Sequence, residues 1–533
     1  MSSLATLEFD NRFTAELPAD QNPSPMPHQA PGAAFSRVEP TPTAQPELIA
    51  VSGEAAELLG FDEEQLTSKE FRDMATGNLL LPGMDAFAMR YGGHQFGNWA
   101  GQLGDGRAIN LGELVTPDGS RQTLQLKGAG RTPYSRGADG LAVLRSSIRE
   151  FLCSETMFNL GVPTTRALSL GLTGDQVMRD MLYDGNAALE PGAVVCRVAP
   201  SFIRFGNFEL PSSLGELDEL RLLTNFTIRE YYPELWPNDG EPTAATYAEF
   251  FREVVRRTAE TIVHWQRVGF VHGVMNTDNL SILGLTIDYG PYGWLEDYDP
   301  DWTPNTTDRQ GRRYRFANQP GIGQWNLMQL GNALSPLVDD IEPLQEAIDA
   351  YVGDFGSGHQ QMMGAKLGLA GWDEADNPLL SDLLDNLTAA ETDMTLFFRG
   401  LAEVTTVAGT SADDRFAPLI GAFYRPEEQL TDELKVRWNG WLDRYVARVG
   451  RDGTSDGARR EAMNSVNPLY VLRNYLAQIA IDKSTEGDHS EILALLDVMR
   501  NPYVEQDGME RFAEKRPDWA RTRVGCSMLS CSS

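Results

Sequence analysis

One stretch of the 533-residue chain, HGVMNTDNLSILGLTIDYG at residues 272–290, constrains the fold more than any other. Its Asp-Asn pair is followed by two short apolar runs on either side of Gly284, and then by Asp-Tyr-Gly. Apolar runs that flank a glycine predict a small hairpin. Such a hairpin would bring Asn279 and Asp288 together, and amide and carboxylate oxygens are ligands that magnesium prefers. We therefore predict a metal site at the two ends of this stretch.

The spacing is similar to that of protein kinases, in which a catalytic loop H-R-D-x-x-x-x-N is followed by a D-F-G metal site. Val274 stands where the kinase aspartate is expected, five residues before Asn279, and valine cannot accept a proton. Asp278 is the only carboxylate within the loop. We interpret it as the base, which must reach the hydroxyl proton that it removes. The alternative is an aspartate that caps a turn.

The first half of the chain carries the other parts that a kinase-like phosphate site needs. GQLGDGR, residues 101–107, places three glycines and Arg107 between apolar runs, although an ordinary hairpin turn would look similar and the spacing is not G-x-G-x-x-G. Lys127 ends the apolar run TLQLK, and Glu150 follows within a predicted helix. Taken alone, these two residues are more simply interpreted as a solvated lysine and a surface glutamate. Their order along the chain favours a phosphate-binding lysine positioned by a helix glutamate.

Two further cations, Arg197 and Arg204, flank Pro200 in an apolar stretch where burial is expected. A buried arginine needs an anionic partner, which is either a carboxylate or a phosphate. With Arg107 and Lys127 they place four positive charges on the expected nucleotide side. We expect His94, in YGGHQFGNWAGQ, to be a packing residue rather than a ligand.

The sequence pattern changes from mainly strand-like to mainly helical near residue 206. Residues 17–48 are rich in Pro, Ala and Gln and predict an extended arm, and strand-like runs then surround one helix that Gly161 ends. VVCRVAPSFIRFGNFE predicts a further strand bent at Pro200, and a long amphipathic helix ends at Gly269. We predict an α+β, bilobal, protein-kinase-like fold with a strand-rich N-lobe and a mainly helical C-lobe. The predicted parts are an N-terminal extension (1–70), the N-lobe (71–205), the C-lobe (206–520) and a Cys-containing tail (521–533).

Charge limits the partners. The chain has 45 Lys plus Arg against 76 Asp plus Glu, a net charge of −31 that disfavours nucleic acid and anionic lipid surfaces. No apolar run is long enough to span a membrane, and the first residues lack the pattern of a signal or transit peptide. Only four cysteines occur, so we expect the reducing cytoplasm. We expect a monomer because no coiled-coil heptads appear.

Four blocks in order carry a resemblance to a known family: YGGHQFGNWAGQLGDGRAINLGE, LQLKGAGRTPYSRGADGLAVLRSSIREFL, VCRVAPSFIRFGNFE and HGVMNTDNLSILGLTIDYGPYG. They resemble the selenoprotein O family, and the similarity runs from near residue 8 through the C-terminus. The resemblance implies a kinase fold that binds ATP inverted relative to kinases. It also implies metal-dependent transfer of AMP to Ser, Thr or Tyr hydroxyls of target proteins.

The resemblance also implies roles for single residues. Asp278 would be the base, Asn279 and Asp288 would bind Mg²⁺ or Mn²⁺, and Glu150 would pair with Lys127. Residues implied to contact the nucleotide are Gly104, Gly106, Arg107, Lys127, Asp139, Gly140, Arg197, Arg204 and Asp288.

The tail GCSMLSCSS departs from part of the family pattern. In some relatives a tail cysteine forms a disulfide with a cysteine of the activation segment, but here that segment, residues 294–316, has none. A bridge between Cys526 and Cys531 and a reduced tail both stay open.

Three alternatives to AMP transfer from ATP remain. One is a catalytically silent nucleotide-binding pseudokinase, and the complete set of Lys127, Glu150, Asn279 and Asp288 argues against it. The second is UMP transfer from UTP. The third is a small-molecule phosphotransferase, although such enzymes keep an aspartate where Val274 stands.

Overall fold

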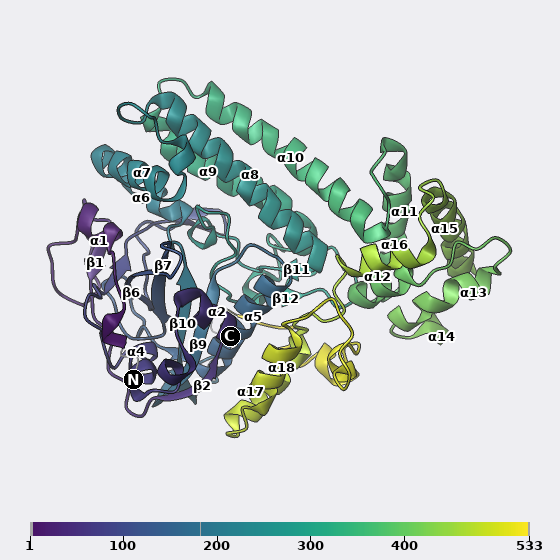
Figure 1. Ribbon diagram of the computed structural model, residues 1–533, viewed down its shortest axis with the longest axis horizontal. Helices are drawn as coiled ribbons and strands as arrows, with labels where there is room; N and C mark the ends of the chain where they lie inside the picture. Colours follow the sequence, from purple (N-terminus) through teal and green to yellow (C-terminus); the bar gives the residue numbers. More distant parts are fainter. Residues whose placement is uncertain (1–3, 182, 531–533) are drawn as a thin grey trace.

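The structure is a computed structural model that describes residues 4–181 and 183–530. It is a mixed α+β protein in which an antiparallel sheet forms within the first 200 residues and helices dominate thereafter (Figure 1). This confirms the predicted α+β class and the order of a strand-rich part before a helical part. No helix among the described residues is both long and apolar enough to cross a membrane.

The main sheet has eight strands, paired antiparallel in the order β1-β3-β6-β7-β10-β9-β2, with β8 paired to β10. The strands are β1 (Phe35–Arg37), β2 (Glu47–Val51), β3 (Phe87–Met89), β6 (Ala108–Val115), β7 (Arg121–Lys127), β8 (Ala142–Val143), β9 (Arg166–Arg179) and β10 (Ala188–Ala199). The predicted hairpin turn at TPDGSR joins β6 to β7 and is confirmed.

The arm predicted over residues 17–48 contributes β1 and the start of β2 to the sheet, so the prediction that it holds no packed element was wrong. β1 pairs with β3, and β2 pairs with β9. The Phe35 ring packs against Phe13 and Phe87 with centroids 5.8 Å and 5.3 Å away, which buries it completely. Proline-rich composition disfavoured a strand, but burial of this aromatic side chain stabilises the pairing. The predicted domain boundaries stay a prediction.

The helix predicted before Gly161 is confirmed as α5 (Leu144–Asn159). Gly161 follows it in the left-handed region, with φ 69°. Ile148, Phe151 and Leu152 are buried, and α5 packs across β9 and β10. This packing places Glu150 beside Lys127, with a carboxylate oxygen 2.5 Å from Lys127 Nζ.

The strand predicted to continue past Pro200 ends at Ala199, and α6 (Phe205–Leu214) begins shortly after it. The backbone N–H of Arg204 donates to Asn207 Oδ1 at 2.8 Å. This side-chain bond satisfies a backbone group at the helix start, so the local capping pattern overrides the strand-like composition.

The helical part follows α6. The helix predicted up to Gly269 is confirmed as α8 (Ala244–Val268), which lies beside α9 and α10 (Figure 1). The other helices of this part are α7 (Leu217–Tyr231), α9 (Gln319–Leu334), α10 (Glu342–Leu367), α11 (Asn377–Thr388), α12 (Met394–Ala402), α13 (Ala412–Phe416), α14 (Pro426–Gln429), α15 (Asp432–Gly450), α16 (Asp456–Asn464), α17 (Asn474–Thr485) and α18 (Ser490–Val498). Four short helices precede the sheet's centre: α1 (Arg12–Glu16), α2 (Gly53–Leu59), α3 (Glu63–Leu66) and α4 (Lys69–Ala75).

Helices α11–α16 lie far from the sheet around a core of their own that contains Trp438 and Trp441, whereas α17 and α18 turn back to pack on α5 (Figure 1). Two small hairpins complete the fold, β4 (His94–Gln95) with β5 (Asn98–Trp99) and β11 (Phe270–Val271) with β12 (Gly293–Trp294). The hairpin predicted around Gly284 is reduced to one antiparallel bridge between Leu280 and Thr286.

Candidate active site

A cleft of about 720 Å³ is lined by both the sheet region and the 272–291 loop. It gathers most of the residues that the sequence singled out, although they come from six separate segments. These residues are Gly104, Gly106, Arg107, Lys127, Asp139, Gly140, Arg204, Asp278, Asn279 and Asp288. Arg197 and Glu150 do not line the cleft; both are buried directly behind it.

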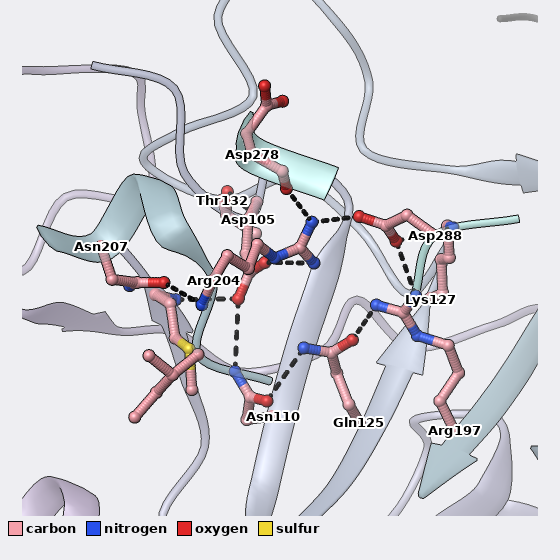
Figure 2. Close-up of polar contacts among 12 residues, drawn as sticks. Asp105, Asn110, Gln125, Lys127, Thr132, Arg197, Arg204, Asn207, Asp278 and Asp288 are labelled. Atoms are coloured by element: carbon pink, nitrogen blue, oxygen red, sulfur yellow. Dashed lines mark hydrogen bonds and ion pairs between the residues drawn. The ribbon is translucent and has the colours of Figure 1, made fainter. Parts of the chain in front are cut away.

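Asp288 is the centre of an ion-pair cluster (Figure 2). Its Oδ1 lies 3.1 Å from Lys127 Nζ and 2.7 Å from Arg197 Nη1, and its Oδ2 pairs with Arg204 Nη1. Glu150 closes the cluster from behind, with oxygens 2.5 Å from Lys127 Nζ and 2.8 Å from Arg197 Nη1. Burial by itself would raise the pKa of Asp288, but the three cations lower it well below its ordinary value. Asp288 is therefore ionised at neutral pH.

The sheet register explains why these side chains meet. Arg197 on β10 stands opposite Gln125 on β7, two residues before Lys127. Side chains two residues apart on a strand share a face, so Gln125 and Lys127 lie on the same face of the sheet as Arg197. Gln125 Oε1 accepts a hydrogen bond from Arg197, and Gln125 Nε2 donates to Asn110 Oδ1 at 2.9 Å (Figure 2).

Asp288 has φ 59°, the left-handed conformation that a non-glycine residue rarely adopts. Such a conformation costs on the order of 1–3 kcal/mol and persists where the surroundings hold it. Here the three cations around the carboxylate provide that hold. In this backbone conformation the Asp288 carboxylate faces the cleft.

Asp278 lies on another side of the cleft. Its Oδ2 accepts a hydrogen bond from Gln95 Nε2 at 3.2 Å, and its Oδ1 is buried without a hydrogen-bond partner among the described residues. Burial raises the pKa of Asp278 to about 6. A carboxylate with one free oxygen and a pKa just below neutrality is suited to take a proton from a hydroxyl.

The start of the β4–β5 hairpin packs closely against Asp278 and the residue before it. A Cβ atom on Gly93 would lie 2.7 Å from Asp278 Oδ1, so only glycine allows this approach. The backbone N–H of His94 donates to Thr277 Oγ1 at 2.7 Å, while His94 Nδ1 lies 2.8 Å from Glu209 Oε2. The imidazole of His94 is thus held by a carboxylate and by neighbouring rings.

Asn279 and Asp288 offer oxygens that fit a hard divalent cation. Asn279 Nδ2 donates to the carbonyl of Val274 at 2.9 Å, which turns the amide oxygen away from that carbonyl. Within residues 4–181 and 183–530 no cluster of three or more His, Cys, Asp or Glu side chains is arranged to hold a metal. A cation here would take two protein oxygens and complete its shell with phosphate and water, which is how magnesium usually binds beside nucleotides.

The glycines act through close approach of two loops. Gly104 has φ 85°, and a Cβ there would lie 2.4 Å from Tyr134 Cγ. Gly140 has φ 75°, and a Cβ there would lie 2.1 Å from the carbonyl oxygen of Gly130. Asp139 beside it pairs with Arg179 at 2.8 Å. Gly101, by contrast, does not line the cleft.

Several site residues escaped the sequence interpretation. Asp105 is buried and accepts from the backbone N–H of Met89 at 3.0 Å, and one of its oxygens lies 3.6 Å from Arg204. Burial raises its pKa. Its Asp-Gly sequence suggested only a turn, and nothing local marked Gln95 or Gln125. Other cleft residues without a clear sequence signal are Arg131, Tyr134 and Arg136.

The tail contacts the segment 294–316. The backbone N–H of Thr306 donates to the carbonyl of Leu529 at 2.7 Å, and Leu529 N–H donates to that of Pro304 at 3.0 Å. Cys526 is buried, and Cys531 lies outside the described residues, so the proposed bridge between them stays a prediction.

Comparison with known proteins places these observations in a family context. A family model described as "Protein adenylyltransferase SelO" matches residues 24–500. The chain is 58% identical over 538 residues to the protein nucleotidyltransferase YdiU of Rhodopirellula baltica, with 99% of each chain covered. It is also 58% identical over 534 residues to that of Aromatoleum aromaticum (99% and 100% covered). The corresponding protein of Azoarcus sp. is 56% identical over 527 residues, with 99% of each chain covered.

Proposed function

The chain belongs to the SelO family of protein adenylyltransferases, and from this premise we propose how its cleft transfers AMP to a protein hydroxyl. The protein is a nucleotidyltransferase with a nucleotide as donor and proteins as acceptors. We propose that the donor is ATP, bound inverted relative to kinases so that the α-phosphate faces Asp278. The kinase-like bilobal arrangement implied by the family agrees with a sheet region and a helical region that share the cleft.

One observation carries this proposal: the Asp278 carboxylate points away from Asp288 and the cations around it, although Arg204 Nη1 also donates to the backbone carbonyl of Asp278 at 2.8 Å (Figure 2). Asp278 has one oxygen without a hydrogen-bond partner in the described part of the chain, whereas Lys127 and Arg204 converge on Asp288. Val274 lines the cleft where a kinase base would stand, and it cannot accept a proton. A nucleotide whose α-phosphate lay beside Asp278 would direct its terminal phosphates toward the cations.

The chemistry then follows from the side chains present. Asp278 takes the proton of the acceptor hydroxyl, and the resulting oxygen attacks the α-phosphorus. The bond from the α-phosphorus to the bridging oxygen breaks, and pyrophosphate leaves with that electron pair. Arg107, Lys127 and Arg204 stabilise the charge on the leaving group, because preorganised cations cost little rearrangement during the reaction. Arg197 and Glu150 hold Lys127 and Asp288 from behind.

Mg²⁺ or Mn²⁺ fits the oxygens of Asn279 and Asp288, and when bound it would neutralise phosphate charge. The acceptor hydroxyl belongs to Ser, Thr or Tyr in this proposal. We further infer a cytoplasmic monomer from the sequence, in which cysteines are few and no coiled-coil heptads occur.

A paired labelling assay tests the proposal. The full chain is incubated with Mg²⁺ and a general protein acceptor, once with ATP labelled at the α-phosphate and once with ATP labelled at the γ-phosphate. A third tube contains UTP labelled at the α-phosphate. Asp278→Ala is compared with Asp218→Ala, since the Asp218 side chain is 99% exposed. We expect α-label from ATP to enter protein with the wild type and Asp218→Ala only.

Transfer of γ-label would contradict the inverted nucleotide. Preferential transfer from UTP would reassign the donor. Full α-labelling by Asp278→Ala would remove Asp278 as the base.

A further inference from the structure

We propose that the surface beside Asp278 docks an acidic segment of the acceptor protein. The inference rests on the proposed function, because the hydroxyl of this segment is the one that would reach Asp278. The docking surface consists of an aromatic and apolar part and a cationic part. Its members are Trp99, Trp325, Met328, Arg309 and Arg312.

A continuous row of rings leads outward from the base. Gln95 contacts Asp278, and the neighbouring His94 ring lies between two tryptophans, with centroids 5.1 Å from Trp99 and 5.5 Å from Trp325. The guanidinium carbon of Arg313 lies 4.6 Å from the Trp325 ring centroid. A chain segment that placed its hydroxyl at Asp278 would therefore run over this row.

The cationic loop is attached to the same catalytic segment. Tyr314 OH donates to Asn276 Oδ1 at 2.7 Å, and the backbone N–H of Phe96 donates to the same oxygen at 3.1 Å. A Cβ on Gly97 would lie 3.4 Å from the guanidinium carbon of Arg313. The loop with the arginines and the β4–β5 hairpin are thus both fixed within two residues of Asp278.

Apolar surface is exposed at this position. Trp99 is 40% exposed and Met328 is 44% exposed, while Trp325 is half-buried. Trp325 and Met328 are three residues apart on α9 and so share one face of the helix. Tryptophan and arginine are the side chains that most often dominate protein–protein binding, and an apolar patch with a polar rim marks such a surface.

The charged side chains of the arginine loop indicate what kind of partner would bind this surface. Arg309 and Arg312, whose side chains are exposed, form no ion pair with any residue of the described ranges, whereas Arg315 in the same loop lies 2.9 Å from Asp301. The acids nearby are engaged: Asp308 accepts from the backbone N–H groups of Arg313 and Tyr314, and Glu209 faces His94.

Two exposed guanidinium groups, those of Arg309 and Arg312, therefore lie without an ion pair among the described residues on a chain with a net charge of −31. Because most of the charge on the chain is negative, an acidic segment is attracted to these two cations and repelled by most of the remaining surface. Such local complementarity steers a partner and fixes its register.

The test uses the full chain and three fluorescent peptides with one central hydroxyl residue, flanked by glutamates, glutamines or lysines. Binding is measured by fluorescence anisotropy with Mg²⁺ and a non-hydrolysable ATP analogue, and AMP transfer to each peptide by mass spectrometry. The main variant is Arg309→Glu with Arg312→Glu, since both side chains are exposed. The matched control is Lys435→Glu with Arg437→Glu on α15, which makes the same charge change at two exposed cations without ion pairs in the described ranges.

We expect the wild type to bind the glutamate peptide roughly fivefold more tightly than the lysine peptide, as a few exposed charge pairs would give. The preference should weaken with added salt. The Arg309/Arg312 variant should reverse the preference and the control should keep it. Trp99→Ala should weaken all three peptides and leave their ratio unchanged.

Equal binding of the peptides, or no binding of any, would overturn the docking surface, as would an Arg309/Arg312 variant that behaves like the control. A single-stranded oligonucleotide that bound more tightly than the glutamate peptide would reassign the surface and also overturn the proposal. Preferential binding of the glutamate peptide without AMP transfer to any acceptor would count against the proposed function alone.

Discussion

Gln95 Nε2 lies 3.2 Å from Asp278 Oδ2 and so joins the β4–β5 hairpin to a loop 183 residues further along the chain. The other carboxylate oxygen, Oδ1, has no hydrogen-bond partner among the described residues. The hydrogen bond from Gln95 stabilises the charged form of the carboxylate and opposes the effect of burial. The position and the pKa of the proposed base thus depend on a residue that belongs to a different part of the chain.

The pH dependence of AMP transfer should depend on the hydrogen bond between Gln95 and Asp278. Burial raises the pKa of Asp278 to about 6, so transfer should fall as the pH is lowered through about 6 and the base becomes protonated. Gln95→Ala removes a bond that favours the charged form, so the acid limb of the kcat/KM profile should move to higher pH. Gln345→Ala, which removes an exposed glutamine on α10, is the control. An acid limb that stayed in place in Gln95→Ala would contradict the role of Gln95.

The ionised Asp278 side chain should lower the free energy of unfolding near neutral pH. Its folded-state pKa is raised from 3.8 to about 6, so the folded state binds the proton more tightly than the unfolded state does. The stability contributed by this proton is present at low pH and is lost as the pH rises through about 6. Asp278→Asn should therefore raise the free energy of unfolding by up to about 3 kcal/mol near neutral pH, given about 1.4 kcal/mol for each pKa unit. The gain should vanish in acid. Urea denaturation at several pH values measures it, and a variant less stable than the wild type near pH 8 would contradict the prediction.

Arg197 should contribute mainly to the stability of the fold, and Arg107 mainly to ATP binding. Arg197 is completely buried and pairs with Glu150 and Asp288, so Arg197→Met should destabilise the fold by about 3–5 kcal/mol because two carboxylates lose a partner. Arg107 lines the cleft, is half-buried and has no ion pair within the described ranges. Arg107→Met should leave stability within about 0.5 kcal/mol but weaken ATP binding.

Thermal unfolding and calorimetric ATP titration of the two arginine variants separate these effects. Arg197→Lys provides a further check of the role of Arg197, since lysine keeps the positive charge but lacks the planar guanidinium group. The assignment fails if Arg197→Met unfolds at the wild-type temperature and only its ATP affinity has dropped.

Two glycines of one turn offer a matched pair. Gly101 and Gly104 both have positive φ, 70° and 85°, so alanine at either position should cost about 1 kcal/mol of backbone strain. At Gly104 the added Cβ would lie 2.4 Å from Tyr134 Cγ, whereas at Gly101 no atom of the described residues beyond the chain neighbours lies within 4 Å of it. Gly104→Ala should cost an additional 1–3 kcal/mol or so and impair ATP binding, because the loop at Tyr134 must move.

A second substitution identifies the cause. Tyr134→Ala should recover part of the ATP affinity lost in Gly104→Ala, since it removes the ring that the new Cβ would meet. Equal effects of alanine at Gly101 and Gly104, measured by urea denaturation and ATP titration, would contradict the steric explanation.

Local patterns in the sequence were sufficient for several elements. The β6–β7 hairpin, α5 and α8 were predicted because a turn sequence, a helical repeat of apolar residues and a terminal glycine act over a few neighbouring residues. The strand β1 and the start of α6 were not, because a buried phenylalanine and a side-chain cap determine them.

The available chemical groups and their order can be read from the chain: a lysine at the end of a strand, a helix glutamate, and an Asp-Asn pair before Asp-Tyr-Gly. The surroundings of these groups are set by folding. Lys127 and Asp288 meet across 161 residues, Arg197 lies behind the cleft while Arg204 faces it, and Gln95 reaches Asp278. The physical reason is that burial and the nearest charges set the ionisation and direction of a side chain. Both depend on neighbours that are distant in the chain and become adjacent only in the folded protein.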